Sequence, residues 1–193
     1  MSDTKTTSLT ALFWDKFITK TNVELADLPD RCKGGNGSFL KGMVATKAQD
    51  FLADDSEVSE DSEDWVTAET IDGAVFAYPN VERTLNMENP MNYGSAPNMD
   101  AQAFGLIVSM IVYSHASFGF YESNPQLSEV MGSNYHKLRM SFYGLLDVAL
   151  HPDEIADDAD DETTTRIAWF SELTEAQKEA LSVMSQGIYS ITN

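Results

Sequence analysis

The sequence is poor in positive charge and contains one cysteine. Its 193 residues include 12 Lys and Arg against 31 Asp and Glu, which gives a formal net charge of −19 at pH 7. A protein that binds nucleic acid through the phosphate backbone needs lysine and arginine, so we do not expect direct binding of DNA or RNA. The single Cys32 excludes an intramolecular disulfide and is typical of a reducing compartment. These two shortages predict a cytoplasmic protein.

The sequence also lacks the patterns of a signal peptide and of a membrane span. The apolar run near the N-terminus is short and is interrupted by Asp15. The longest apolar stretch, 104–120, contains Ser109, Ser114 and His115 and has no basic flanks. This composition predicts a buried core helix and no contact with a membrane.

Residue patterns of catalytic and metal sites are missing as well. The glycine cluster at 34–37 lacks the Gly-Lys-Ser/Thr ending of a phosphate-binding loop. The histidines are not spaced from one another or from Cys32 as zinc ligands are; they are His115, His136 and His151. No Gly-x-Ser-x-Gly motif and no dinucleotide-binding fingerprint occurs. We therefore predict a protein that is not an enzyme and that uses no metal or cofactor.

The sequence does contain a high density of carboxylates in two runs. They are Asp54, Asp55, Glu57, Glu60, Asp61, Glu63 and Asp64 in the first run, and Asp153, Glu154, Asp157, Asp158, Asp160, Asp161 and Glu162 in the second. Such runs are commonly solvated loops that aid solubility. They are also compatible with a surface that imitates duplex DNA, which carries about one charge per 1.7 Å, and that steers a basic partner protein. Charge alone leaves both interpretations open.

Hydrophobic spacing predicts short elements in the first half of the chain. The pattern favours a helix over 8–20, and a second short helix over 42–51 after a glycine-rich loop. Residues 65–79 are rich in β-branched and aromatic residues on both sides of Asp72-Gly73, which is typical of a hairpin with a two-residue turn. At most one more short strand, around 81–85, is expected before a polar loop.

The second half is predicted to be mainly helical. Asn98 or Asp100 is expected to cap an apolar helix. A second long helix is expected over 127–150, with Tyr135 on its apolar face and Arg139 on its polar face. Near the C-terminus, a capping box predicts the start of one more amphipathic helix, which extends to about Tyr189; its residues are Thr174 and Gln177.

Together these elements predict an α+β fold. We expect a single domain, 1–193, in which a small antiparallel sheet with its hairpin at Asp72-Gly73 packs against several helices and carries acidic loop insertions. An N-terminal helical and loop region, 1–50, precedes a central core, 65–153. An extra helical extension, 165–193, follows the core.

Several motifs in the central region have a characteristic order and spacing. Trp65 precedes the turn Asp72-Gly73 by seven positions, and Pro79 follows the turn. The later motifs are Asn92-Tyr93, Met99–Leu106, Ser114-His115 with Phe118, Tyr135–Arg139 and His151-Pro152-Asp153. In order and spacing they resemble the antirestriction family of plasmid proteins typified by ArdB and KlcA. The chain departs from the family pattern at Ala74, where the family has a second glycine, and in the acids that follow Pro152.

The resemblance implies a non-enzymatic α+β protein of a mobile element that relieves type I restriction in the cytoplasm of a bacterial host. Its partner would be a host defence nuclease. The matched positions are interpreted mostly as structural, and they are Trp65, Gly73, Phe76, Asn92, Gly105, His115 and Tyr135. In an alternative interpretation, His115 and Tyr135 line a pocket.

Our leading hypothesis from the sequence is antirestriction in which the acidic runs steer the protein to its target or imitate DNA. One alternative is an inhibitor of another DNA-targeting defence nuclease, comparable to anti-CRISPR proteins. The other is a protein-interaction or regulatory module whose acids serve only solubility.

Overall fold

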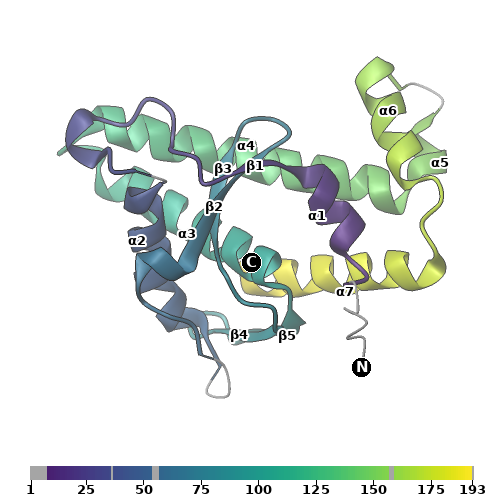
Figure 1. Cartoon of the computed structure of the whole chain (residues 1–193), viewed down its shortest axis with the longest axis horizontal. Coiled ribbons are helices and arrows are strands. Elements are labelled where there is room, and N and C mark those ends of the chain that lie inside the picture. Colours follow the sequence, from purple (N-terminus) through teal and green to yellow (C-terminus); the bar gives the residue numbers. More distant parts are fainter. Residues whose placement is uncertain (1–7, 36, 54–56, 157–158, 193) are drawn as a thin grey trace, which may run out of the picture.

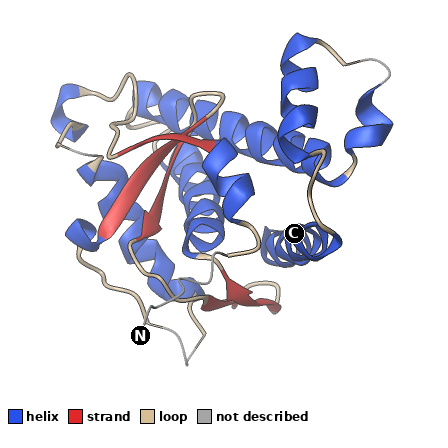
Figure 2. Cartoon of the chain, turned by 45° about the vertical axis from the view of Figure 1, so that its right-hand side comes forward, coloured by secondary structure: helices blue, strands red, loops and turns tan. Residues whose placement is uncertain are grey.

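A three-stranded antiparallel sheet is at the centre of the fold (Figures 1 and 2). The computed structural model describes residues 8–35, 37–53, 57–156 and 159–192. The strands of the sheet, in their spatial order, are β1 (Ile18–Thr21), β2 (Trp65–Thr70) and β3 (Val75–Pro79). Two long helices pack beside it, α3 (Ala101–Gly119) and α4 (Pro125–Leu150). This arrangement confirms the predicted α+β single-domain fold.

Shorter helices surround this centre. They are α1 (Ala11–Phe17), α2 (Ser38–Ala48), α5 (Pro152–Ile155), α6 (Asp161–Phe170) and α7 (Glu175–Thr192), together with the 3-10 turns η1 (Asp30–Cys32), η2 (Gln49–Phe51) and η3 (Ser62–Asp64). The predicted capping box of α7 is confirmed, because the amide of Thr174 donates to Gln177 Oε1 at 3.0 Å and the amide of Gln177 donates to Thr174 Oγ1 at 3.3 Å. These reciprocal bonds satisfy amides that the first turn of a helix leaves without partners.

The predicted β2–β3 hairpin is confirmed, with a longer turn than expected. Trp65 pairs with Pro79, and the two strands stay in register up to the turn. The turn has three residues rather than two, since the amide of Gly73 donates to the Thr70 carbonyl and the amide of Thr70 donates to the Ala74 carbonyl. Gly73 has a φ of 75°, a left-handed conformation that only glycine adopts without steric cost and that this type of turn requires.

Polar side chains of α3 and α4 satisfy the edge of β3 that has no neighbouring strand. The amide of Ala77 donates to Ser109 Oγ at 3.0 Å, and the amide of Val75 donates to Asn134 Oδ1 at 3.3 Å. The Tyr113 hydroxyl donates to the Val75 carbonyl at 2.6 Å, and burial raises the pKa of this hydroxyl well above its ordinary value. An exposed strand edge is thereby converted into a buried contact whose backbone groups all have partners at these positions.

Helix α3 is a core helix, as its sequence predicted. It is long and apolar enough to span a membrane by length and composition, but 67% of its most apolar window is buried inside the fold. Asp100 occupies its N-cap position, yet the carboxylate does not cap the helix. It instead accepts hydrogen bonds from the Thr10 hydroxyl and, at 3.0 Å, from the indole nitrogen of Trp14. These bonds attach α1 to the start of α3.

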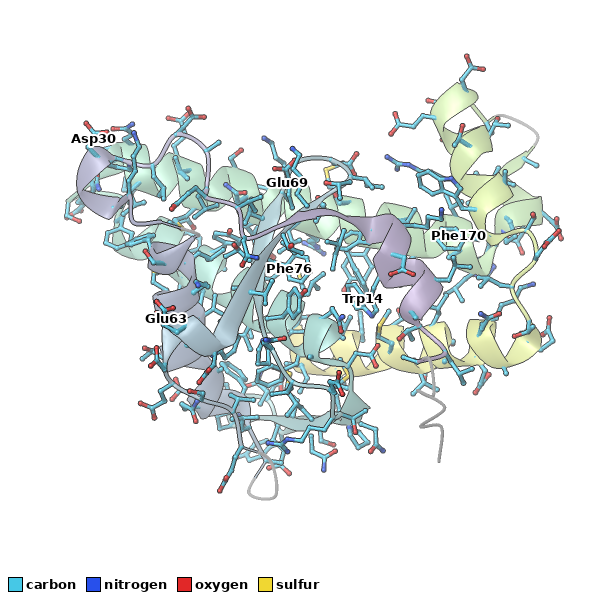
Figure 3. The ribbon with its side chains drawn as sticks, in the orientation of Figure 1. Trp14, Asp30, Glu63, Glu69, Phe76 and Phe170 are labelled. Carbon is cyan, nitrogen blue, oxygen red and sulfur yellow. The ribbon has the colours of Figure 1, made fainter. Side chains whose placement is uncertain are left out.

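Aromatic rings from four elements form the part of the core that joins the N-terminal helix to α6 (Figure 3). Ring centroids lie 5.6 Å apart for Phe13 and Phe142, 6.0 Å apart for Phe17 and Phe76, and 6.3 Å apart for Phe13 and Phe170. All five side chains are buried. Segments from both ends of the chain therefore belong to one hydrophobic core.

The prediction of a helix over 8–20 was wrong at its C-terminal end. Helix α1 ends at Phe17, and the next four residues form β1. These residues are β-branched except for Lys20, whose ammonium contacts the Glu69 carboxylate on β2 at 2.8 Å. Pairing with β2 outweighs the helical spacing, because β-branched residues favour strands and the strand gains a partner.

The prediction of at most one strand near 81–85, followed by a loop, was also wrong. A second sheet consists of β4 (Leu85–Asn89) and β5 (Gly94–Met99), which pair as a hairpin. Its sequence is polar because β5 exposes Ser95, Pro97 and Asn98, while the buried side of the hairpin packs against α7. A Cβ at Gly94 would lie 2.0 Å from the Ser190 carbonyl oxygen, so the contact with α7 requires glycine there.

Candidate functional site

The described acids of the first run lie on one exposed surface beside β2. This first acidic surface consists of Glu57, Glu60, Asp61, Glu63 and Asp64, all of which are exposed. Their carboxylates form no ion pair within the part of the chain that the structure describes. Asp54 and Asp55, which the sequence analysis also assigned to this surface, lie outside the described residues.

Hydrogen bonds attach this surface to the core. The indole nitrogen of buried Trp65 donates to the Ser59 carbonyl at 2.8 Å, and Gln49 Nε2 donates to the Val58 carbonyl at 3.3 Å. Asp61 Oδ1 accepts from the amide of Glu63 at 3.0 Å and caps η3. The backbone between 57 and 64 is therefore held in place by hydrogen bonds, and its carboxylates are exposed to solvent.

The second run differs because part of it is helical, which the sequence analysis did not predict. This second acidic surface consists of Asp153 and Glu154 on α5, Asp160 before α6, and Asp161 and Glu162 in the first turn of α6. All five side chains are exposed. The predicted site residues Asp157 and Asp158 lie outside the described residues.

Three acids of the second surface have partners within the protein. Asp160 Oδ1 accepts from the amide of Thr163 at 2.8 Å, and this backbone hydrogen bond lowers the pKa of the Asp160 carboxyl. Glu162 pairs with Arg166, whose guanidinium also contacts the Asp72 carboxylate at 3.1 Å and so links α6 to the β2–β3 turn. Glu154 lies 3.7 Å from the imidazole of His151. Acids at the start of a helix also interact favourably with its dipole.

The two acidic surfaces lie on opposite sides of the molecule along its long axis. In Figure 3, Glu63 marks the first surface at the left, and Phe170, at the end of α6, lies at the right. Figure 1, in the same orientation, labels α5 and α6 at the right. The two runs therefore do not form one continuous acidic strip.

Five of the seven positions that carry the family resemblance have structural contacts. Trp65 and Phe76 are buried in the core, and Gly73 forms the hairpin turn. A Cβ at Gly105 would lie 2.3 Å from the Ala77 carbonyl oxygen, so glycine allows α3 to approach β3 closely. The Asn92 side chain donates to the carbonyls of Ser190 and Ile191 at 3.2 and 3.3 Å and holds the β4–β5 turn against α7.

The other two positions, His115 and Tyr135, line a shared cavity between α3 and α4. We call it the α3–α4 cavity, and its volume is about 250 Å³. Side chains of α3 and α4 line the cavity. The β4–β5 turn, the end of α7 and Phe51 contribute the rest of its lining. Its lining residues are Phe51, Asn89, Met91, Met110, Ile111, Ser114, His115, Tyr135, Arg139, Tyr143, Ile191 and Thr192.

Arg139 and Tyr143 were not predicted from the sequence to be neighbours of Tyr135. Arg139 was expected on the polar face of the helix, opposite Tyr135. The spacing i, i+4, i+8 in fact puts all three side chains on one face of α4, where they line the same cavity. That spacing was available in the sequence and is the signal that could have identified the site.

No metal site is evident in the described part of the chain, where no group of three or more His, Cys, Asp or Glu side chains converges. His115 is on α3, His136 is on α4, and His151 follows α4. Comparison with protein-family models, with curated proteins and with solved structures found no match to this chain.

Proposed function

We propose that the protein is a non-enzymatic inhibitor of a host DNA-defence nuclease and that it relieves type I restriction. The proposal starts from the family resemblance of the central region. The observation that carries it further is that the motifs behind the resemblance, though scattered between Trp65 and Tyr135, pack together as one unit. Phe76 of β3 lies in the core, Gly105 of α3 touches β3, and His115 and Tyr135 meet at the α3–α4 cavity.

The first acidic surface supplies the contact with the nuclease in this proposal. It presents five exposed carboxylates without cationic partners among the described residues, next to the β2–β3 hairpin. Nucleases that act on DNA have basic channels, and a concentration of negative charge increases the rate at which such a partner is encountered. The second surface lies on the other side of the molecule and already uses part of its charge to stabilise α6.

The test is the plating efficiency of unmodified phage on a strain with a type I restriction system, with the protein or with an empty vector. We expect plating to rise towards the level seen on a strain without the restriction enzyme. A Gly105→Val variant, which cannot pack α3 against Ala77, is the control that removes the fold. A soluble, folded protein that gives no relief against representatives of the type I systems would contradict the proposal. Relief confined to a strain with a CRISPR effector would favour the alternative target.

A further inference from the structure

The α3–α4 cavity has a charge opposite to that of the rest of the molecule. The chain has 31 acidic residues against 12 Lys and Arg, yet none of the residues that line this cavity is an aspartate or a glutamate. The lining instead includes the guanidinium of Arg139 and the imidazole of His115. In a protein with a net charge of −19, this local composition disfavours cations and favours an anionic group.

Four of the polar side chains that line the cavity have no hydrogen-bond or ion-pair partner among the described residues, whereas Asn89 and Thr192 do. The Arg139 guanidinium, the His115 imidazole and the hydroxyls of Tyr135 and Tyr143 form no hydrogen bond or ion pair there. Five other cations of the chain are paired, since Lys20, Lys33, Lys47, Arg166 and Lys178 each lie within 3.7 Å of a carboxylate. Several donors that converge on one hollow and are left without protein acceptors are typical of a ligand site.

The shape of the cavity limits the size and character of the ligand. Its volume of about 250 Å³ lies just below the usual range for ligand pockets, roughly 300–1,000 Å³, so the ligand must be small. Buried Phe51, Met110 and Ile191 give it an apolar floor, and the rings of Tyr135 and Tyr143 form one wall. Most of the lining belongs to α3 and α4, which pack against each other, so this part of the site is preformed.

From these features we propose that the α3–α4 cavity binds a small molecule that combines one carboxylate or phosphate group with a flat apolar part. Arg139 forms a bidentate, charge-assisted hydrogen bond with the anionic group, and His115 and the tyrosine hydroxyls add further donors. The apolar part lies against the tyrosine rings and the floor. This inference does not depend on the proposed antirestriction function.

The test is an NMR titration of the isotope-labelled full chain with four probes: phenyl phosphate, benzoate, inorganic phosphate and neutral benzyl alcohol. We expect saturable shifts for backbone signals of α3 and α4 around the cavity with phenyl phosphate or with benzoate. Inorganic phosphate has the anionic group without the apolar part, and benzyl alcohol has the apolar part without the charge. Each should bind at least about tenfold more weakly. Whichever of phenyl phosphate and benzoate binds with the higher affinity indicates whether the natural ligand carries a phosphate or a carboxylate.

Two variants on α4 make the test specific. Arg139→Gln weakens binding of the aryl anion by about tenfold or more, because a charge-assisted hydrogen bond is lost. Lys137→Gln is the matched control: it removes the same charge from an exposed position that does not line the cavity, and it changes the affinity by less than about twofold. Arg139 is exposed, so both variants keep the fold, and their NMR spectra report it.

The proposal is overturned if no probe shifts the cavity signals at millimolar concentration. It is also overturned if Arg139→Gln and Lys137→Gln weaken binding equally, since binding would then depend only on overall charge. Equal affinity for benzyl alcohol and benzoate would show that the site does not recognise an anion.

Discussion

The two acidic surfaces have similar compositions, but only the second has carboxylates that form ion pairs with other described residues of the protein. On the second surface, Asp160 accepts a backbone hydrogen bond at the start of α6, and Glu162 pairs with Arg166. On the first, five exposed carboxylates lack cationic partners among the described residues. Acidic runs that look alike in a sequence can therefore either stabilise a helix or remain available to another molecule, and their partners in the structure distinguish the two roles.

The sharpest test of this comparison removes three charges from each surface in turn. We expect Glu60→Gln, Glu63→Gln and Asp64→Asn together to lower restriction relief by at least about tenfold, because steering of a basic partner depends on these charges. The matched variant, Asp153→Asn, Glu154→Gln and Asp161→Asn, keeps the relief. Plating efficiency measures both. An equal loss in both variants would show that only net charge matters, and full relief in both would assign the acids to solubility.

A second test concerns the ion pairs of the second surface. Arg166 is largely buried, with 16% of its side chain exposed, and it connects Glu162 on α6 to Asp72 in the hairpin turn. Arg166→Met keeps the aliphatic stem and removes both pairs. We expect a loss of about 1 kcal/mol in the free energy of unfolding, which corresponds to a melting temperature lower by roughly 2–4 °C for a chain of this size. An unchanged melting temperature would mean that these pairs do not stabilise α6.

A third and smaller effect concerns the cap of α6. We expect Asp160→Ala to lower the melting temperature at neutral pH, because the amide of Thr163 loses its acceptor, and Asp160→Asn to retain most of the stability. The pKa of the Asp160 carboxyl is lowered in the folded state, so its stabilisation is complete above the unfolded value of about 3.9. It is lost as the pH falls through the lower, folded value.

Thermal unfolding of the wild type and of Asp160→Ala at a series of pH values measures this dependence. The difference between the two melting temperatures stays constant near neutrality and shrinks only in acid. A difference that is constant down to the lowest pH would show that the charge of the carboxylate does not contribute to the cap.

Local patterns were sufficient to predict the elements whose stability is mainly local. The Asp72-Gly73 turn, the capping box at Thr174 and the long apolar helix α3 all have short-range signals, and the structure contains each of them. Strand β1 could not be predicted in this way, because its residues continue the spacing of α1 and become a strand only by pairing with β2. The β4–β5 hairpin was missed because its buried side is completed by α7, far away in the sequence.

The candidate sites, too, were predictable from the sequence only where they depend on local patterns. Exposure of the first acidic run follows from composition, but the absence of partners for its carboxylates depends on how the chain folds around it. His115 and Tyr135 came from the motifs, whereas the cavity between them requires the crossing of α3 and α4 and the approach of α7. Arg139 could have been added from its spacing to Tyr135 alone.

The smallest expected effect is on stability after neutralisation of the first surface. Glu60→Gln combined with Glu63→Gln removes no intramolecular ion pair within the described chain, so the free energy of unfolding should change by less than about 0.5 kcal/mol. The sign should be an increase, because neighbouring carboxylates repel one another, and it should disappear as added salt screens that repulsion. Thermal unfolding at low and high salt tests both points, with Arg166→Met as the contrasting variant. A clear loss of stability would mean that these carboxylates hold the fold, as the second surface does, and would remove the reason for assigning them to a partner.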